Sequence, residues 1–550
     1  MPDRSSLRRI FAPLIIAFVV LFVLYAIVTW MPLRTARAEW RSGRVADAIA
    51  NAESWSRSRM WPNQYHQLLA IAYTSSGQQP SARAHLAQLQ RKQLWISLVP
   101  KDEVAKSFFG RGDYESFIEY DQAVRERNEP AGIALHRAAA FAAMGRFDEA
   151  ARALQTMNRS VVDARKLATL QTTIAQRRSG RFAFVFDRNG SPIADFSAGG
   201  LFAVDRDFAP LIEEKGGELT FGAHKGELGS MNTVETTLDS AVQHAAKAAL
   251  QNYRGAFVAI DPRTNELLAI VSNDARNLAL EEQYEPGSII KVLTGLDAFN
   301  SGTNVPAMFP YHCSGDLLID GRHFGDWVTA GHGMLPDLDE ALAESCNVFF
   351  ADAGIRLGAE RLQKFMTTAG FDGQTDLGVF KVPLGRLVGD GFNKYETGHL
   401  AIGLEHESVN AIHVAMLASM MANRGLLTTP RLIRARRSVL GEVVSGPPPQ
   451  AQARIASHEI AERMVQAMVA VVTRPKGTGR RADIDGVSLA LKTGTAGKRQ
   501  DGYHAVIMAF APVDSPKIAF GLIAERSGPA EFAGAKIAHD FLLQIRDRLK

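Results

Sequence analysis

One segment near the start of the chain allows very little choice of structure. From residue 10 to residue 30 the sequence holds twenty-one consecutive residues without a charged side chain. A helix rises about 1.5 Å per residue, so this run spans about 31 Å, the thickness of a bilayer's hydrocarbon core. Three arginines precede the run, which favours an N-terminus on the cytoplasmic side. We predict that residues 1–33 form a cytoplasmic tail and a single membrane anchor.

The alternative for this segment is a signal peptide that is removed after export. Ala36-Arg37-Ala38 has the small-x-small form of a cleavage site. The apolar run is longer than the roughly 7–15 residues usual for a signal peptide, so its length favours the anchor. Both interpretations place the remainder of the chain outside the cytoplasm.

The composition of the chain excludes several classes of protein. Hydrophobic residues make up 46% and charged residues 22% of 550 residues, which predicts several folded domains rather than disorder. A formal net charge of +4 gives no sign of a nucleic-acid partner. Two cysteines, Cys313 and Cys346, are too few for a disulfide framework or a four-thiolate zinc site. A single bridge between them stays open.

A loose repeat fills residues 34–180. Each unit has a glycine followed five residues later by a small residue, and the glycines are 34, 35 and 33 residues apart, at Gly43, Gly77, Gly112 and Gly145. This period is typical of tetratricopeptide-type hairpins, in which the glycine ends one helix and the small residue lets the next pack closely. Phe117 departs from the pattern. We predict an all-α tetratricopeptide-like solenoid that binds peptides or partner proteins; an unrelated helical bundle is the alternative.

The pattern of the chain changes at residue 181, where short strand-like runs begin. Two strands joined by a turn are predicted within residues 255–272, and a helix-rich stretch follows over residues 288–422. Further strand-like runs come at 487–492, 504–512 and 517–524, before a closing helix at 535–549. This order predicts an α+β domain with a helix-covered sheet over residues 231–550, after a short linker or pedestal remnant at 181–230.

Two short motifs in this domain supply groups for nucleophilic catalysis. The first is Ser288-Ile-Ile-Lys291. If Ser288 opens a helix, Lys291 lies one turn further on the same face. Its amine can then take the serine proton, provided that burial or a nearby cation lowers its pKa. The second, Ser345-Cys346-Asn347, begins 57 residues later and offers a hydroxyl to relay a proton and an amide to hold a peptide.

The third motif, Lys492-Thr493-Gly494-Thr495, is predicted at the end of a strand. Lys492 supplies a cation that lowers the pKa of Lys291, the two threonines can bind a carboxylate, and Gly494 leaves room for a substrate. Each motif alone is weak. The three together, in this order and spacing, form the set that marks penicillin-interacting serine enzymes.

From about residue 182 to its end the chain resembles the transpeptidase part of class B penicillin-binding proteins. Further matching segments are FDRNG (186–190), VETTLDSAVQ (234–243), AIDPRTNELLAIVS (259–272), YEPGSIIK (284–291), GHG (331–333), KGTG (476–479) and FAPVDSPKIA (510–519). The resemblance implies that Ser288 attacks the penultimate D-Ala carbonyl of a D-Ala-D-Ala stem peptide and releases D-Ala. An amine of a neighbouring stem then resolves the acyl-enzyme and cross-links peptidoglycan.

The resemblance also implies a role for each motif residue. Lys291 is the general base, and Ser345 passes a proton to the leaving amine. Asn347 binds the donor amide. The substrate carboxylate, or that of an inhibiting β-lactam, binds at Lys492, Thr493 and Thr495, and Gly494 lies among them. The oxyanion hole consists of the backbone N–H groups of Ser288 and Thr495. The family requires no metal and no organic cofactor.

The family also implies a bacterial inner-membrane protein with its catalytic domain on the periplasmic face and a membrane glycan polymerase as partner. We expect the repeats to bind other cell-wall proteins, and the small net charge predicts no nucleic-acid partner. This chain departs from the family in its short pedestal and in Asp326-Trp327, where relatives often carry a second cysteine. A D,D-carboxypeptidase or endopeptidase, or a non-catalytic scaffold, stays open as an alternative.

Overall fold

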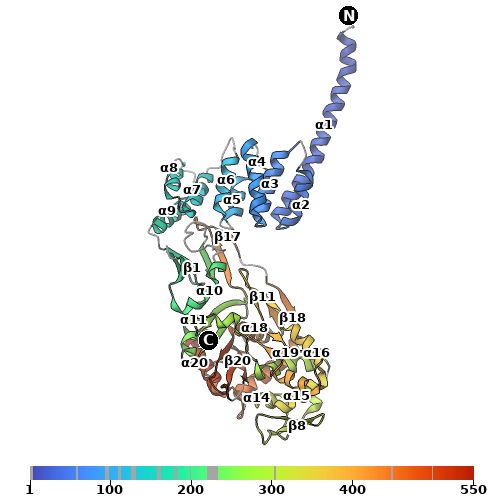
Figure 1. The fold of residues 1–550 in the computed structure, drawn as a ribbon, viewed down its shortest axis with the longest axis vertical. Helices are drawn as coiled ribbons and strands as arrows, with labels where there is room; N and C mark the ends of the chain where they lie inside the picture. Colours follow the sequence, from blue (N-terminus) through green and yellow to red (C-terminus); the bar gives the residue numbers. More distant parts are fainter. Residues whose placement is uncertain are drawn as a thin grey trace.

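The computed structural model describes residues 4–56, 60–92, 98–109, 113–124, 132–155, 157, 163–178, 182–197, 200–219, 233–302, 305–446, 450–497 and 500–550. The chain has three parts in order: a long N-terminal helix, a row of helices, and a larger mixed domain on the side of the row away from the N-terminus (Figure 1). Gly112 and the end of the expected linker (220–230) lie outside the described residues.

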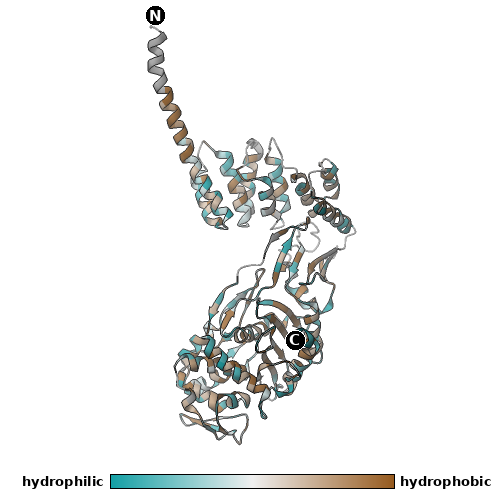
Figure 2. Cartoon of the chain, turned by 180° about the vertical axis from the view of Figure 1, so that it is seen from behind, coloured by the Kyte–Doolittle hydropathy of each residue, from teal (hydrophilic) through white to brown (hydrophobic). Residues whose placement is uncertain are grey.

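The first helix, α1 (Arg4–Arg41), joins the apolar run to the helical row without a break. Its stretch Ile15–Arg41 is long and apolar enough to cross a membrane, and a signal sequence passes the same test. Apolar side chains between Ile15 and Val28 are mostly half exposed and stand out in Figure 2. By contrast, Leu33 and Ala36 are fully buried against the helices that follow.

The row consists of helices packed side by side, mostly on their neighbours in sequence, although α4 packs on α6 and α9 on α7 (Figure 1). Their bounds are α2 (Val45–Trp55), α3 (Pro62–Ser75), α4 (Gln79–Lys92), α5 (Lys101–Phe109), α6 (Tyr114–Ala123), α7 (Ile133–Ala143), α8 (Phe147–Gln155) and α9 (Ala164–Arg178). The repeat glycines at 43, 77 and 145 have φ of 82°, 79° and 72°, a conformation that suits glycine at a helix end. The alanines five residues later, at 48, 82 and 150, are fully buried. This all-helical part is compatible with the predicted solenoid.

A six-stranded sheet connects the row to the catalytic part, in the order β17-β16-β4-β1-β2-β3. Its elements are β1 (Phe182–Phe186), β2 (Pro192–Ser197), β3 (Gly200–Ala203), β4 (Thr233–Thr236), β16 (Ile433–Arg437) and β17 (Val443–Ser445), with η2 (Arg206–Phe208) and α10 (Ala209–Leu219) following β3 in the chain. Within the segment 181–230, which we expected to be a linker or pedestal remnant, β1, β2 and β3 belong to this sheet. They join it because β1 pairs with β4, which in turn pairs with a hairpin from far along the chain.

The tip of that hairpin reaches the helical row. Val439 and Leu440 lie between β16 and β17 and are buried in the hydrophobic core of the row. Glu442 accepts a hydrogen bond from Lys166 on α9, and its other oxygen lies 3.5 Å from His136 Nε2 on α7. The catalytic part thus contacts the row through apolar burial and an ionic contact.

The catalytic core is an antiparallel five-stranded sheet in the order β19-β20-β21-β5-β6. Its strands are β5 (Gly255–Asp261), β6 (Glu266–Ser272), β19 (Ala490–Ala496), β20 (His504–Ala511) and β21 (Ile518–Ala524), and its helices are α11 (Ser240–Leu250), α18 (Ala411–Ala422) and α20 (Ala533–Leu549). α18 packs on β20, β21 and β5, whereas α11 and α20 pack on each other and on the same sheet. Every residue of β5, β6 and β21 is buried, as in a sheet covered on both faces.

The middle of the domain holds more short strands than the predicted helix-rich stretch. Its helices are α12 (Leu278–Glu281), η3 (Gly287–Ile289), α13 (Ile290–Asn300), η4 (Val305–Met308), α14 (Leu338–Ala343), α15 (Asn347–Leu357), α16 (Ala359–Thr368), α17 (Lys394–Ile402), α19 (His458–Thr473) and η5 (Arg480–Ala482). Its strands are β7 (Tyr311–Cys313), β8 (Asp316–Ile319), β9 (Arg322–Gly325), β10 (Gly333–Leu335), β11 (Gln374–Asp376), β12 (Lys381–Pro383), β13 (Arg386–Leu387), β14 (Glu407–Ser408), β15 (Leu426–Thr428) and β18 (Gln452–Arg454). These strands form isolated two-stranded ribbons, too short for periodicity to reveal.

Candidate active site

The first two motifs meet at a buried lysine. Ser288 lies in η3, the single turn that leads into α13, and Lys291 follows on the first turn of α13. Lys291 is fully buried, and its Nζ donates to the Ser345 carbonyl and to Asn347 Oδ1, both at 2.6 Å. Ser345 Oγ lies 3.3 Å from the same amine. Helix α13 thus places the amine between the nucleophile's turn and the second motif.

The third motif completes this cluster from the sheet. It lies in the middle of β19, since the strand extends to Ala496 rather than ending at Lys492 as the sequence suggested. Lys492 is fully buried, and its Nζ donates to Ser345 Oγ and to the Thr493 carbonyl, both at 2.9 Å. The Ser345 hydroxyl is therefore within hydrogen-bond distance of both amines and can pass a proton between them.

Burial lowers the pKa of both lysines. For Lys291 the pKa falls to about 8, mainly because burial disfavours the ammonium, although the Asp326 carboxylate acts in the opposite direction. For Lys492 the pKa lies well below its ordinary value, because of burial and then of repulsion by Lys291. Two ammonium groups in one buried cluster repel each other, so one of the two amines is available as a base near neutral pH.

Glycines bring the nucleophile's turn and β19 unusually close. A Cβ at Gly287 (φ 58°) would lie 2.6 Å from the Thr495 carbonyl oxygen, and one at Gly494 would lie 2.4 Å from the Pro286 carbonyl oxygen. Gly494 therefore makes room for the chain's own backbone before Ser288. Ser288 and Thr495 both line the same opening.

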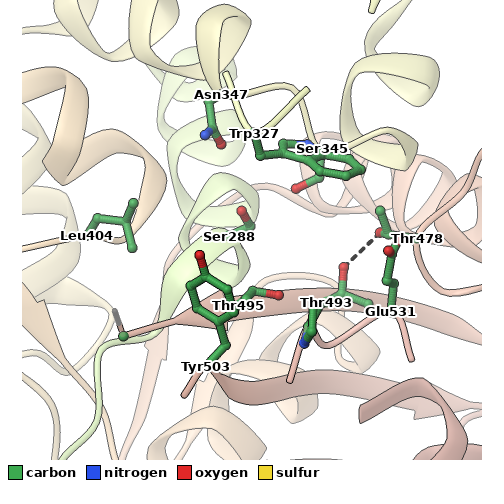
Figure 3. A pocket seen from close by; sticks show the side chains of 12 residues that line it. Ser288, Trp327, Ser345, Asn347, Leu404, Thr478, Thr493, Thr495, Tyr503 and Glu531 are labelled. Atoms are coloured by element: carbon green, nitrogen blue, oxygen red, sulfur yellow. Dashed lines mark hydrogen bonds between the residues drawn. The ribbon is translucent and has the colours of Figure 1, made fainter. Parts of the chain in front are cut away.

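A pocket of about 350 Å³ opens over these groups (Figure 3). Its lining residues are Ser288, Trp327, Ser345, Asn347, Leu404, Thr478, Thr493, Thr495, Gly497, Tyr503, Pro529 and Glu531. Lys291 and Lys492 lie beneath it. Among the described residues, none makes a hydrogen bond to Ser288 Oγ, so the expected bond to Lys291 is not formed in this conformation. The structure thus brings every predicted site residue to one place, with Ser288 facing the opening.

Sequence reasoning assigned no role to seven residues of the pocket wall, among them Gly497 and Pro529. Thr478 Oγ1 lies 2.7 Å from Thr493 Oγ1 and belongs to the segment 476–479, which the resemblance had marked without a role. Trp327, Leu404, Tyr503 and Glu531 had no local signal, because each lies on a loop that long-range packing brings to the pocket.

Asp326 fixes the start of α15, which carries Asn347. Its Oδ2 accepts from the backbone N–H of Asn347 at 2.9 Å and of Val348 at 3.2 Å, and its Oδ1 lies 3.2 Å from His332 Nε2. Burial alone would raise the pKa of this carboxyl, but the hydrogen bond to His332 and the charge of Lys291 lower it overall. Ser345, just before α15, has a φ of 56°, a strained backbone for a non-glycine residue that aims its hydroxyl at the two amines.

Two groups among the described residues have metal-ligating side chains close together. Cys313, Asp326 and Cys346 are buried, and their ligand atoms lie within 4.8 Å of one another. Both cysteines are free thiols, and each Sγ lies within 3.5 Å of Asp326 Oδ2. The second group is Asp205, Asp207 and His244 on the surface of the small sheet. The first group lies behind Ser345, and neither group lines the pocket.

Comparison with known proteins agrees with this geometry. The family model described as "Penicillin binding protein transpeptidase domain" matches residues 255–546. The peptidoglycan D,D-transpeptidase PbpA of Mycolicibacterium smegmatis is 29% identical over 341 residues, which are 54% of this chain and 67% of that protein. The stage V sporulation protein D of Bacillus subtilis is 28% identical over 341 residues, and the chain spans about half of its length, 51%.

A third relative and a solved structure complete the comparison. The peptidoglycan D,D-transpeptidase MrdA of Acinetobacter baumannii is 27% identical over 374 residues, 58% of this chain and 55% of that protein. The crystal structure of PBPA from Mycobacterium tuberculosis has the same fold, with a TM-score of 0.58 and 22% identity over 66% of this chain and 99% of that one.

Proposed function

Because the chain belongs to the penicillin-binding protein transpeptidase family, we propose that it is a membrane-anchored serine D,D-transpeptidase that cross-links peptidoglycan stem peptides and is acylated by β-lactams. The observation that carries this proposal is the meeting of Lys291 and Lys492 at the Ser345 hydroxyl, beneath a pocket that exposes Ser288. A scaffold would have no need of two buried amines at an open serine.

The first step is attack by Ser288 on the penultimate D-Ala carbonyl. The terminal carboxylate of the substrate binds between Thr493, Thr495 and the charge of Lys492. An anion at that position stabilises the ammonium form of Lys492, so the shared positive charge moves there and Lys291 becomes the neutral base. Lys291 then takes the proton of Ser288, which lies one turn earlier on the same helical face.

The tetrahedral intermediate is stabilised by the backbone N–H groups of Ser288 and Thr495. Each such donor contributes about 3–4 kcal/mol to catalysis in serine enzymes. The proton reaches the leaving D-Ala amine through Ser345, which touches both lysines. The Asn347 amide binds the donor peptide. An amine from a second stem then attacks the acyl-enzyme by the reverse path; if water attacks instead, the enzyme is a carboxypeptidase.

The N-terminal parts are assigned as follows. α1 anchors the chain in the bacterial inner membrane, with the catalytic domain on the periplasmic side. The helices α2–α9 are a tetratricopeptide-like array that recruits cell-wall proteins, and a membrane glycan polymerase is the first partner to test. The continuous α1 and the buried alanines of the array support these assignments.

Labelling with a fluorescent penicillin tests the enzymatic proposal. We expect the full-length protein to take up one covalent label per chain and the Ser288→Ala variant to take up none. Ser301→Ala, at the far end of the same helix, is the matched control and should label like the unchanged protein. A protein that stays unlabelled, while folded by circular dichroism, would refute the proposal and favour the scaffold.

A further inference from the structure

We propose that Glu531, Arg480 and Arg481 form the subsite for the acceptor, and that this acceptor is an amine carried on an acidic peptide. The inference rests on the proposed transpeptidase function and concerns the same site. It assigns the wall of the pocket that the three motifs leave unexplained.

A second groove leads away from the pocket at one end. It has a volume of about 470 Å³ and shares Thr478 and Glu531 with the pocket. Its full lining is Pro475, Lys476, Gly477, Thr478, Arg480, Arg481, Glu531 and Phe532. In Figure 3 Thr478 and Glu531 lie toward one end of the view and Leu404 toward the other, with Ser288 between them. The two hollows therefore form one path that begins at the nucleophile.

Reaction symmetry identifies this end of the pocket as the acceptor's side. The leaving D-Ala carries the carboxylate that Thr493 binds, and Thr478 is hydrogen bonded to Thr493. The leaving amine therefore departs toward Thr478. An acceptor amine must enter where the leaving amine left, because attack on the ester is the reverse of amine expulsion. Its peptide then extends past Thr478 and Glu531 into the second groove.

Glu531 has the charge that an incoming ammonium requires. It is half-buried, and among the described residues none offers it a hydrogen bond or an ion pair. A carboxylate at this point attracts the ammonium and holds it near the acyl carbonyl. The ammonium loses one proton to water before attack. In the attack the N–C bond forms, the ester C–Oγ bond breaks, and the second amine proton passes through Ser345 to Ser288 Oγ.

The outer part of the groove has the opposite charge. Arg480 and Arg481 are exposed, and in the described part of the chain neither has an acidic partner. The Arg481 guanidinium lies 5.0 Å from the centre of the Phe532 ring, which limits its movement. Lys476, by comparison, is paired with Glu344. Guanidinium groups that lack an acidic partner can bind carboxylates through two hydrogen bonds each. The groove therefore matches a peptide whose amine lies near Glu531 and whose carboxylates lie near the two arginines.

The experiment compares two acceptors that differ only in charge. The full-length protein in detergent receives a D-Ala-D-Ala donor peptide together with an acceptor peptide that carries one free amine and two carboxylates, or its diamide. Aminolysis is measured as kcat/KM for the acceptor and divided by the same variant's rate of acylation by penicillin. We expect the unchanged protein to prefer the acidic acceptor by about 10-fold, as hydrogen bonds to charged groups imply.

The variants separate the two ends of the groove. Arg480→Gln with Arg481→Gln should abolish the preference. Glu531→Gln should lower normalised aminolysis of both acceptors by about 10-fold, mainly through KM, and Glu531→Asp should recover part of it. Arg386→Gln and Glu459→Gln are exposed controls outside the groove and should keep the preference.

Two outcomes overturn the inference. One is a protein that uses both acceptors equally, and the other is a preference that survives the double arginine variant. In either case normal penicillin labelling would leave the transpeptidase proposal standing. Absence of labelling would instead refute that proposal, so the two failures are distinguishable.

Discussion

Replacement of Gly494 by alanine tests whether close backbone approach creates the oxyanion hole. The new Cβ would lie 2.4 Å from the Pro286 carbonyl oxygen, 3.1 Å from Ile289 Cγ2 and 3.3 Å from Val506 Cβ. Because one of these neighbours is backbone, β19 and the turn before Ser288 must separate. For the new Cβ to lie even 3.0 Å from the Pro286 carbonyl oxygen, the two segments must move apart by about 0.6 Å.

A shift of this size moves two hydrogen-bond donors relative to each other. Thr495 is the next residue in the chain after Gly494, and Ser288 is two residues after Pro286. Separating Gly494 from Pro286 therefore also separates the two backbone N–H groups. Loss of one oxyanion donor lowers the rate about 10²–10³-fold, or about 2.7–4 kcal/mol. We therefore expect the second-order rate constant for acylation by penicillin to fall by about 10²–10³-fold in Gly494→Ala.

The assay is stopped-flow or gel-based acylation with fluorescent penicillin, together with a thermal melt. Overpacking costs about 1–3 kcal/mol of stability, so the melt shows whether the variant is folded at the assay temperature. Gly325→Ala on β9 is the matched control, because a Cβ there meets nothing within 4 Å and its φ is not left-handed. Acylation within threefold of the unchanged protein would refute the role of this approach.

Two further predictions follow. The acylation rate should rise with pH and be half-maximal near pH 8, because the neutral form of Lys291 is the base and burial lowers its pKa to about 8. A stopped-flow series of acylation rates at different pH values checks this. A midpoint near the ordinary lysine pKa of 10.5 would contradict it. Leu440→Ala should weaken the contact between the hairpin and the helical row by about 2–5 kcal/mol and speed hydrogen exchange in α5 and α9. Val443→Ala, at an exposed position on β17, is the control and should change neither. Equal exchange rates in the two variants would contradict the contact.

The sequence predicted the reactive groups because their geometry is largely local. Ser288 and Lys291 are one helical turn apart, and this spacing alone brings an amine to the nucleophile's side. The strands β5 and β6 and their turn were also predictable, because two short, nearly continuous apolar runs flank a turn sequence. The meeting of Lys492 with Ser345 spans 147 residues, and no periodicity contains that contact. It was expected only through the resemblance to a family.

The parts that escaped prediction depend on long-range packing. Glu531 and Trp327 reach the pocket from loops, and a single residue on a loop has no pattern in the sequence. The hairpin of β16 and β17 pairs with β4 about 200 residues earlier in the chain, and β4 pairs with β1. No local pattern shows that the strand-like runs after residue 181 join a sheet with this hairpin. Such pairings become visible only when the fold is known.

The position of the catalytic part relative to α1 follows from contacts at both ends of the helical row. At the first end, the Tyr65 hydroxyl donates to the Thr29 carbonyl at 2.9 Å, and the Trp30 and Trp61 ring centres are 4.9 Å apart. These contacts begin where the apolar run ends, so the packing of the row starts at the last residues of that run. At the other end the row holds Leu440 of the catalytic part. Because packed contacts make both connections, the placement of the catalytic part relative to α1 depends on the helical row between them.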